Sequence, residues 1–224
     1  MVNNRYIIAC SGSGTRWNNY LNTKKHLIKI ENETLLDRTI RLLKKFDPNS
    51  EICIFAFDEE YKRDTATFCK PTLLERKEHV KYPAVYMTRE YWNLNGNTTI
   101  LFGDIFFTEN CIKKICENNN TLNFFGRQNG SSITGKEYGE LFGMSFNKDE
   151  KEMVLNKLKI LEQKFKNNEI SRFITWELYR LINKIDLEKH HIEKYFIEID
   201  DFTDDFDFPN DYDIWIKKYK QTLK

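Results

Sequence analysis

The sequence has 224 residues, 40% hydrophobic and 31% charged, so it is long enough to bury one substantial core. Its 35 basic and 34 acidic residues leave a net charge of +1, which disfavours nucleic acid as a partner because nucleic-acid binders usually carry a basic excess. Only 9 glycines and 4 prolines argue against a long disordered linker. No apolar stretch is long enough to span a membrane, so we expect no membrane partner. The sequence shows no internal repeat and no domain boundary, so we expect one domain comprising residues 1–224.

The cysteines predict a reducing environment. There are 5 of them, an odd number, and no two form a C-x-x-C pair. This pattern is typical of a cytoplasmic protein without disulfide bonds or structural zinc. The apolar run near the first residue is too short for the core of a signal peptide, which favours the same location.

The predicted elements of the first half alternate between strands and helices. Residues 58–82 give the weakest secondary-structure pattern of the sequence. The predicted elements are a strand at 5–10, a helix at 34–46 that stops at Asp47-Pro48, a strand at 51–57, a short helix near 59–68, a helix at 83–93 that starts with Pro83, and a strand at 98–107 interrupted by Gly103-Asp104.

The second half continues this alternation. The predicted elements are a helix at 108–119 with Thr108 as its N-cap, strands at 121–127 and 139–147, helices at 149–167 and 171–184, a strand at 195–200 and a closing helix at 209–223. Alternating strands and helices indicate an α/β fold with a mostly parallel sheet. The strands read as continuous apolar runs, which is typical of a sheet covered by helices on both faces.

A glycine-rich stretch, "SGSGTR" (residues 11–16), follows the first predicted strand. Ligands of open α/β sheets bind at the carboxyl ends of strands, where glycines let a phosphate approach the backbone N–H groups closely. Arg16 adds a forked cation that suits the outer phosphates of a nucleotide. The stretch lacks the Lys-Ser/Thr ending of a P-loop. The alternative is that Gly12 and Gly14 only form a tight turn.

Two lysines follow this stretch, Lys24 and Lys25. A lysine here can reach the same phosphates as a point charge. The alternative is an ordinary solvated lysine on the surface. These residues alone leave open which of the two lysines enters the site.

An acidic residue, Asp104, ends the apolar run "TTILFGDIFF". A carboxylate at the end of a buried strand is costly without a partner. It can be a ligand of Mg²⁺, which takes one or two carboxylates together with phosphates and waters. It can also be a simple turn residue, because Gly-Asp pairs favour turns.

A second acidic segment, "DDFDFPNDYD", lies near the end of the chain. Asp205 and Asp207 alternate with Phe206 and Phe208, so an extended chain directs both carboxylates one way and both rings the other. We expect the rings to anchor the segment.

The remaining polar residues favour structural roles. We expect Asp211 to cap the closing helix, His26 to pack in the interior and the histidines at 190–191 to lie on the surface. Arg127 and Lys136 flank a polar loop and either bind an acidic substrate or are solvated loop charges.

The stretch "GSGTRWNNYLNTKKHLIKIENETLLDRTI" (residues 12–40) resembles the G-x-G-T-R…P-K-x-L…G-x-P-L-L signature of the nucleotidyltransferases with a Rossmann-like fold of the GT-A type. Trp17 and "KHLI" are most similar to a branch found in bacterial surface-polysaccharide clusters. That branch includes cytidylyltransferases that act on phosphoglutamine in capsule phosphoramidate synthesis. Two departures are Cys10-Ser11, where Ala-Ala is usual, and Lys24, where Pro is usual.

The resemblance implies a role for each of these residues. It implies that Arg16 and Lys25 are catalytic, Arg16 on the outer phosphates and Lys25 on the charge that develops at the α phosphate. It also implies that Asp104 binds Mg²⁺. The segment "DFDFPNDY" resembles the D-x-D-T-P-E-D pattern near the end of the family's sequences, which implies a second metal ligand there, Asp207 ranked first and Asp205 second. The nucleotide-binding residues that it implies are Cys10, Ser11, Gly12, Ser13, Gly14 and Thr15.

The resemblance further implies the reaction and the partners. A phosphate oxygen of a small phosphorylated acceptor, phosphoglutamine being one candidate, attacks the α phosphorus of a nucleoside triphosphate, CTP being favoured, and pyrophosphate leaves. The base is expected near residues 10–13 and Pro83. Related enzymes are often homodimers.

Three alternatives remain beside this reading. A sugar-1-phosphate nucleotidyltransferase would use the same residues. A GT-A glycosyltransferase needs a D-x-D motif, and "GDIFF" has no second acid two residues after Asp104. A catalytically dead nucleotide-binding protein would lack the arginine, the lysine or the metal aspartate, and all of these are present.

Overall fold

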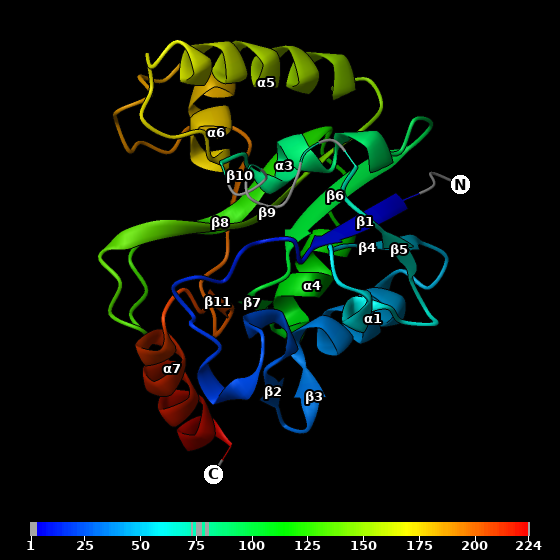
Figure 1. The fold of residues 1–224 in the computed structure, drawn as a ribbon, viewed down its shortest axis with the longest axis vertical. Helices are drawn as coiled ribbons and strands as arrows, with labels where there is room; N and C mark the ends of the chain where they lie inside the picture. Colours follow the sequence, from blue (N-terminus) through cyan, green and yellow to red (C-terminus); the bar gives the residue numbers. More distant parts are fainter. Residues whose placement is uncertain (1–3, 73, 75–77, 79–80, 224) are drawn as a thin grey trace.

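The computed structural model describes residues 4–72, 74, 78 and 81–223. A seven-stranded sheet forms its centre (Figure 1). Its strands, in spatial order, are β10 (Phe196–Glu198), β8 (Leu122–Asn129), β9 (Tyr138–Phe146), β6 (Asn97–Phe102), β1 (Asn4–Ala9), β4 (Glu51–Phe55) and β5 (Thr67–Cys69). Only β9 runs against its neighbours, β6 and β8, within this sheet. The prediction of a mostly parallel α/β sheet is therefore confirmed.

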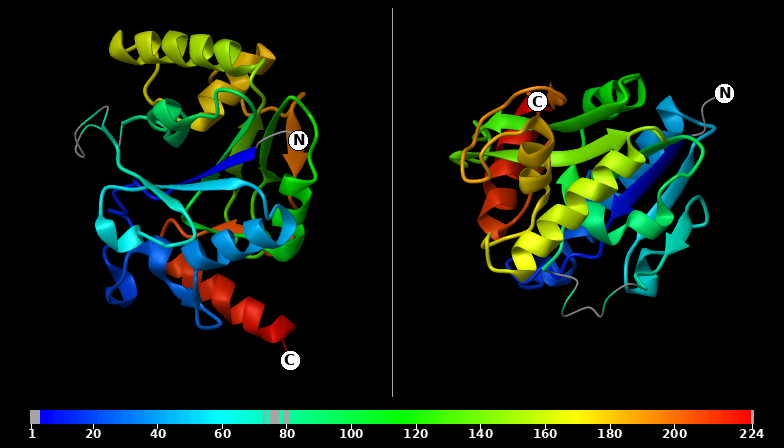
Figure 2. Two further views of the ribbon diagram at one scale, coloured as in Figure 1. Left: turned by 90° about the vertical axis from the view of Figure 1, so that its right-hand side faces the viewer. Right: turned by 90° about the horizontal axis from the view of Figure 1, so that it is seen from above.

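Helices cover both faces of the sheet, as the continuous apolar strands predicted (Figures 1 and 2). Helices α1 and α4 pack on one face, and α3, α5 and α6 pack on the other. The helices are α1 (Leu35–Phe46), α3 (Ala84–Met87), α4 (Glu109–Cys116), α5 (Lys151–Lys166), α6 (Thr175–Asn183) and α7 (Pro209–Thr222), with 3₁₀ turns η1 (Tyr20–Asn22), η2 (Lys25–Leu27), η3 (Glu59–Tyr61) and η4 (Arg89–Tyr91). The limits of the single domain, predicted as residues 1–224, stay a prediction.

Local sequence signals explain where the helices begin. The Thr34 hydroxyl accepts a hydrogen bond from the Asp37 N–H at 3.0 Å and caps α1, and Thr108 caps α4 in the same way. The Asp211 carboxylate accepts a hydrogen bond from the Phe208 N–H at 3.0 Å at the start of α7. The predicted capping roles of Thr108 and Asp211 are confirmed.

Two local expectations are wrong, and one hairpin was not predicted. The segment 59–68 contains only the short turn η3 and the start of β5, because β5 gains its hydrogen bonds by pairing with β4 at the edge of the sheet. The predicted helix at 83–93 stops at Met87, and Trp92 instead packs against Phe146 with ring centroids 4.6 Å apart. A hairpin of β2 (Lys29–Ile30) and β3 (Glu33–Thr34) was not foreseen.

A third apolar cluster lies under α7, outside the central sheet. The ring centroid of Trp215 in α7 lies 4.5 Å from that of Phe106 in β7 (Ile105–Phe106). It lies 5.2 Å from that of Phe206, which follows β11 (Asp204–Asp205). Strands β7 and β11 pair with each other. Trp17 belongs to the same cluster. The cluster therefore brings together the segments that carry the predicted arginine and both acidic sites.

Two further findings concern the whole described chain. All five cysteines are free thiols. Within the described ranges, none of the helices combines the length and the apolar character that crossing a membrane requires.

Candidate active site

The loop from Ser11 to Arg16 leaves the carboxyl end of β1. Gly14 has a φ of 60°, a left-handed conformation that favours glycine, and its carbonyl accepts hydrogen bonds from the N–H groups of Trp17 and Asn18. None of the N–H groups from Ser11 to Arg16 donates a hydrogen bond to another residue of the described chain. A run of such free N–H groups is suited to bind an anion.

Lys25 and Asp104 form an ion pair beside this loop. Gly103 makes the pair possible, because its N–H bonds the Ala9 carbonyl at 3.0 Å and a Cβ there would collide with Cys10. Burial favours the uncharged forms of both groups, but their mutual attraction outweighs it. It raises the pKa of Lys25 and holds the pKa of Asp104 at about 2. Both groups are therefore charged at neutral pH.

Arg16 and Asp207 form a second pair across the loop. The guanidinium donates a hydrogen bond of 2.8 Å from one nitrogen to the carboxylate, and a second nitrogen lies 2.8 Å from the other carboxylate oxygen as an ion pair. Asp207 also lies 3.7 Å from the Lys25 ammonium. Two cations that suit phosphate and two carboxylates that suit a metal therefore contact each other directly, although they come from segments far apart in the sequence.

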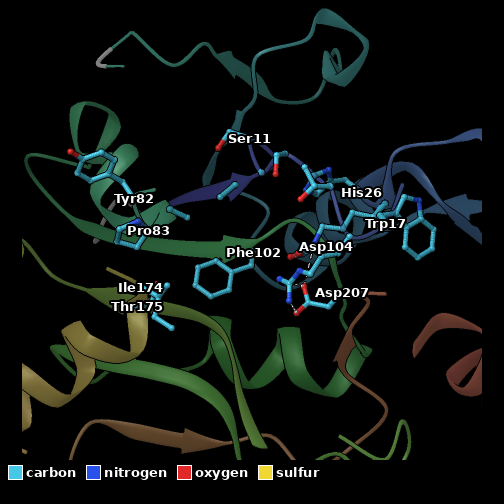
Figure 3. Close-up of a pocket in the computed structure, with 18 residues that line it drawn as sticks. Ser11, Trp17, His26, Tyr82, Pro83, Phe102, Asp104, Ile174, Thr175 and Asp207 are labelled. Carbon is cyan, nitrogen blue, oxygen red and sulfur yellow. Dashed lines mark hydrogen bonds and ion pairs between the residues drawn. The ribbon is translucent and has the colours of Figure 1, made fainter. Parts of the chain in front are cut away.

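These groups line one cavity of about 390 Å³ (Figure 3). Tyr82 and Pro83 lie at one end and Asp104 and Asp207 at the other, with Phe102 between them. The predicted residues that line this cavity are Ser11, Gly12, Ser13, Gly14, Thr15, Arg16, Lys25, Asp104 and Asp207. The polar end suits a triphosphate, and the end at Pro83 is where the base was expected.

Two predicted site residues do not line this cavity. Cys10 is buried and lines a smaller cavity on the other side of the loop, where Lys24 pairs with Asp58 and Glu60. Asp205 is also buried and pairs with Lys136. Asp207 is thus the acidic residue of its segment that faces the nucleotide-sized cavity.

Glu140 of β9 joins the acidic group, although the sequence analysis did not single it out. Ligand oxygens of Glu140, Asp205 and Asp207 lie within 4.8 Å of one another. Burial, followed by the charges of the neighbouring carboxylates, raises the pKa of Glu140, and burial also raises that of Asp205. The only signal in the sequence is a lone acid in an apolar strand, which is costly unless it is partnered.

The acidic groups fit a divalent cation by the chemistry of their donors. They offer only carboxylate oxygens, which are the ligands that Mg²⁺ prefers. Asp104 and Asp207 already share one cation, the Lys25 ammonium, so a positive ion between these two carboxylates is electrostatically suited to the site.

Three expectations about other residues need correction. Arg127 is buried, lines neither large cavity and donates hydrogen bonds to the carbonyls of Asp201 and Thr203, so it is neither a substrate ligand nor a solvated charge. Lys136 is not a solvated charge either, because its side chain is 6% exposed and pairs with Asp205. Phe208 does not anchor its segment, because it is 45% exposed beside the Arg16 guanidinium.

The expectations about histidine are confirmed. His26 is buried, and its Nδ1 lies 2.9 Å from the Tyr61 hydroxyl. Burial lowers its pKa to about 4, so it is neutral at pH 7. His190 and His191 are exposed.

Comparisons with known proteins show what this architecture is similar to. No protein-family model and no curated protein matches the sequence. Among solved structures, the CTP:phosphocholine cytidylyltransferase from Streptococcus pneumoniae matches with a TM-score of 0.60 and 15% identity over 100% of both chains.

Two further structures match over nearly the full length. A proposed glucose-1-phosphate thymidylyltransferase from Bacillus anthracis has a TM-score of 0.60 and 11% identity, over 97% of this chain and 95% of that one. The inositol-1-phosphate CTP transferase from T. maritima has a TM-score of 0.56 and 12% identity, over 97% and 98%. Likeness at such low identity is a likeness of fold. The chain therefore has the Rossmann-like α/β fold on which these three nucleotidyltransferases are built.

Proposed function

We propose that this protein is a nucleotidyltransferase that transfers CMP from CTP to a small phosphorylated metabolite and releases pyrophosphate. The observation that carries the proposal is the 390 Å³ cavity, which gathers a loop of free N–H groups, two cations and two carboxylates at the carboxyl ends of β1 and β6. Three structures with the same fold are named as enzymes of this reaction class.

In this reaction a phosphate oxygen of the acceptor forms a bond to the α phosphorus, and the bond from the α phosphorus to pyrophosphate breaks. The second pKa of a phosphate monoester is about 6, so the attacking oxygen carries no proton at neutral pH and needs no general base. His26, which lines the cavity, is consistent with this, because burial lowers its pKa to about 4 and makes it a weak base. Catalysis then consists of positioning and charge stabilisation.

The cations have separate roles in this proposal. Lys25, buried at the centre of the site, offsets the charge that develops on the α phosphate. Arg16, at the rim with 55% of its side chain exposed, holds the outer phosphates and the departing pyrophosphate. The N–H groups from Ser11 to Thr15 contact the triphosphate along its length.

Asp104 and Asp207 would hold Mg²⁺, which neutralises phosphate charge when it is bound. Asp207 suits this role better than Asp205, because it lines the cavity and contacts Lys25. In the structure the two carboxylates pair with Lys25 and Arg16. Phosphates bound to these cations would leave the carboxylates available to hold the metal.

CTP is the favoured nucleotide because two of the three similar structures are named as CTP-dependent enzymes. The acceptors in those names are phosphocholine and inositol-1-phosphate. The sequence resemblance adds phosphoglutamine and a role in modifying surface polysaccharides.

Thermal unfolding with Mg²⁺ and each of CTP, UTP, GTP and ATP tests the proposal. A ligand at a hundred times its Kd raises the midpoint of a domain of this size by about 5–10 °C. We expect that shift with CTP, a smaller shift without Mg²⁺, and pyrophosphate release when a phosphorylated acceptor is added. A shift with another nucleotide instead of CTP would change the proposed base and leave the proposed reaction type unchanged. The absence of a shift with all four nucleotides contradicts the proposal.

A further inference from the structure

A second cavity of about 500 Å³ adjoins the 390 Å³ cavity, which we call the nucleotide cavity because the proposed function places the nucleotide there. The two cavities share a wall, formed by Arg16, Phe102, Asp104, Ile174, Thr175 and Asp207. A molecule in the second cavity can therefore reach the α phosphate of a nucleotide in the first. If the proposed function holds, this cavity is where the acceptor binds.

The inner wall of the second cavity carries more acid than base. Lys136 lies behind it and pairs with Asp205, while Glu140 and Asp211 lie 3.6 and 3.7 Å from the same ammonium group. One ammonium therefore faces three carboxyl groups. Burial and this crowding raise the pKa of Glu140 to about 9, so a further cation beside it would stabilise its ionised form. The only other cation of this cavity besides Arg16, within the described chain, is Arg172. Its partner Glu177, 3.3 Å away, also pairs with Arg180 at 3.2 Å, so the acidic end of the cavity is the one at Glu140 and Asp205.

The rest of the cavity wall is aromatic and aliphatic. Tyr138 and Trp176 line it together with Phe102. Tyr138 is 57% exposed and Ile174 is 37% exposed, which is unusual for large apolar side chains. Aromatic rings beside carboxylates suit an ammonium group that carries apolar substituents, because ring faces and carboxylates both attract cations. A bare metal ion uses only the carboxylates and leaves the rings without a role.

We propose that the second cavity is a subsite for a positively charged acceptor head group, an ammonium or substituted ammonium, with Glu140 and Asp205 as its counter-charges and Tyr138 at its mouth. This inference rests on the proposed function and narrows its acceptor class. It favours amine-bearing phosphomonoesters over neutral sugar or polyol phosphates. Glu140 determines specificity by binding the head group and does not contact the reacting phosphorus.

Neutral isosteres of the acceptor test this inference directly. Phosphocholine and 3,3-dimethylbutyl phosphate have nearly the same shape and differ in one positive charge. We would measure the binding of each by calorimetry to the protein loaded with Mg²⁺ and a non-hydrolysable CTP analogue, and then pyrophosphate release with CTP. Phosphoethanolamine and propyl phosphate form a second, smaller pair.

We expect each cationic compound to bind at least tenfold more tightly than its neutral isostere. Glu140→Gln should remove most of that preference while the affinity for CTP changes little. Tyr138→Leu, which keeps the apolar volume, should weaken the larger ammonium compound more than the smaller. Glu137→Gln is the matched control, because it removes an exposed charge three residues away that lines neither cavity.

Each outcome separates this inference from the proposed function. Equal binding of charged and neutral isosteres overturns the inference, as does an unchanged preference in Glu140→Gln. A protein that binds CTP but neither ammonium compound overturns it too, and leaves the proposed function intact. A protein that binds no nucleoside triphosphate contradicts the proposed function, and the head-group subsite with it.

Discussion

The two adjoining cavities differ in how their charges are balanced. In the nucleotide cavity each cation has an acidic partner, Lys25 with Asp104 and Arg16 with Asp207. In the second cavity Glu140 and Asp205 share the ammonium of Lys136, which lies behind the wall and also has Asp211 as a neighbour. The first arrangement can exchange its internal pairs for an anion and a metal together. The second has more carboxyl groups than ammonium groups around Lys136, which suits a cation at Glu140 and Asp205.

This difference assigns opposite charge preferences to two parts of one site. Under the two proposals, a polyanion with its metal would bind at the loop after β1, and a positively charged head group would bind at β9 and β11. The shared wall then lies where the phosphates of the two substrates meet. Substitutions that remove one charge at a time should therefore affect one substrate and spare the other.

The largest effect is expected from Lys25→Met, with Lys24→Met as its matched control. Lys25 lies at the centre of the charge network, whereas Lys24 pairs with Asp58 and Glu60 on the far side of the loop. Removing one preorganised charge from an active site lowers kcat by about 10²–10³-fold, and we expect that loss for Lys25→Met alone. Pyrophosphate release below the unfolding midpoint of each variant measures it. An equal loss in Lys24→Met would show that the wrong lysine has been placed in the site.

A smaller pair of effects is expected from Asp207→Asn and Asp205→Asn, which separate the two cavities. Asp207 lines both cavities, so its loss should weaken Mg²⁺-dependent CTP binding and lower kcat on the order of a hundredfold. Asp205 lines only the second cavity and should mainly raise the KM for the acceptor. Steady-state kinetics with each substrate varied in turn distinguish them. Comparable loss of CTP binding in both variants would contradict the division into two charge environments.

The sequence predicted the nucleotide cavity better than the second one, for a physical reason. Residues 11–16 and Lys25 lie close together in the sequence, and their positions follow from a strand, a turn and a short connection. Gly103 and Asp104 likewise indicate a turn after an apolar strand. Short-range signals of this kind specify local backbone geometry directly.

The second cavity depends on contacts that no local pattern contains. Glu140 meets Asp205 because β9 is inserted antiparallel between β6 and β8, and because β11 pairs with β7. Lys136 looked like a loop charge, and only tertiary packing places its ammonium beneath these carboxylates. The same limit explains the missed strand β5, whose hydrogen bonds come from β4.

The smallest effect tests whether the internal pairs of the nucleotide cavity compete with its ligands. Arg16→Ala removes two charge-assisted hydrogen bonds to the outer phosphates, so CTP binding should weaken by about tenfold. The same change frees Asp207 from its 2.8 Å pair, so Mn²⁺, added alone in place of Mg²⁺, should bind a few-fold more tightly. Arg16 is 55% exposed, and losing an exposed pair costs about 0–1 kcal/mol, so stability should hardly change. Calorimetric titration with CTP and with Mn²⁺ measures both changes in affinity. Weaker CTP binding with unchanged Mn²⁺ affinity would mean that Arg16 binds phosphate without restraining Asp207, and the coupling between nucleotide and metal would then rest on Lys25 alone.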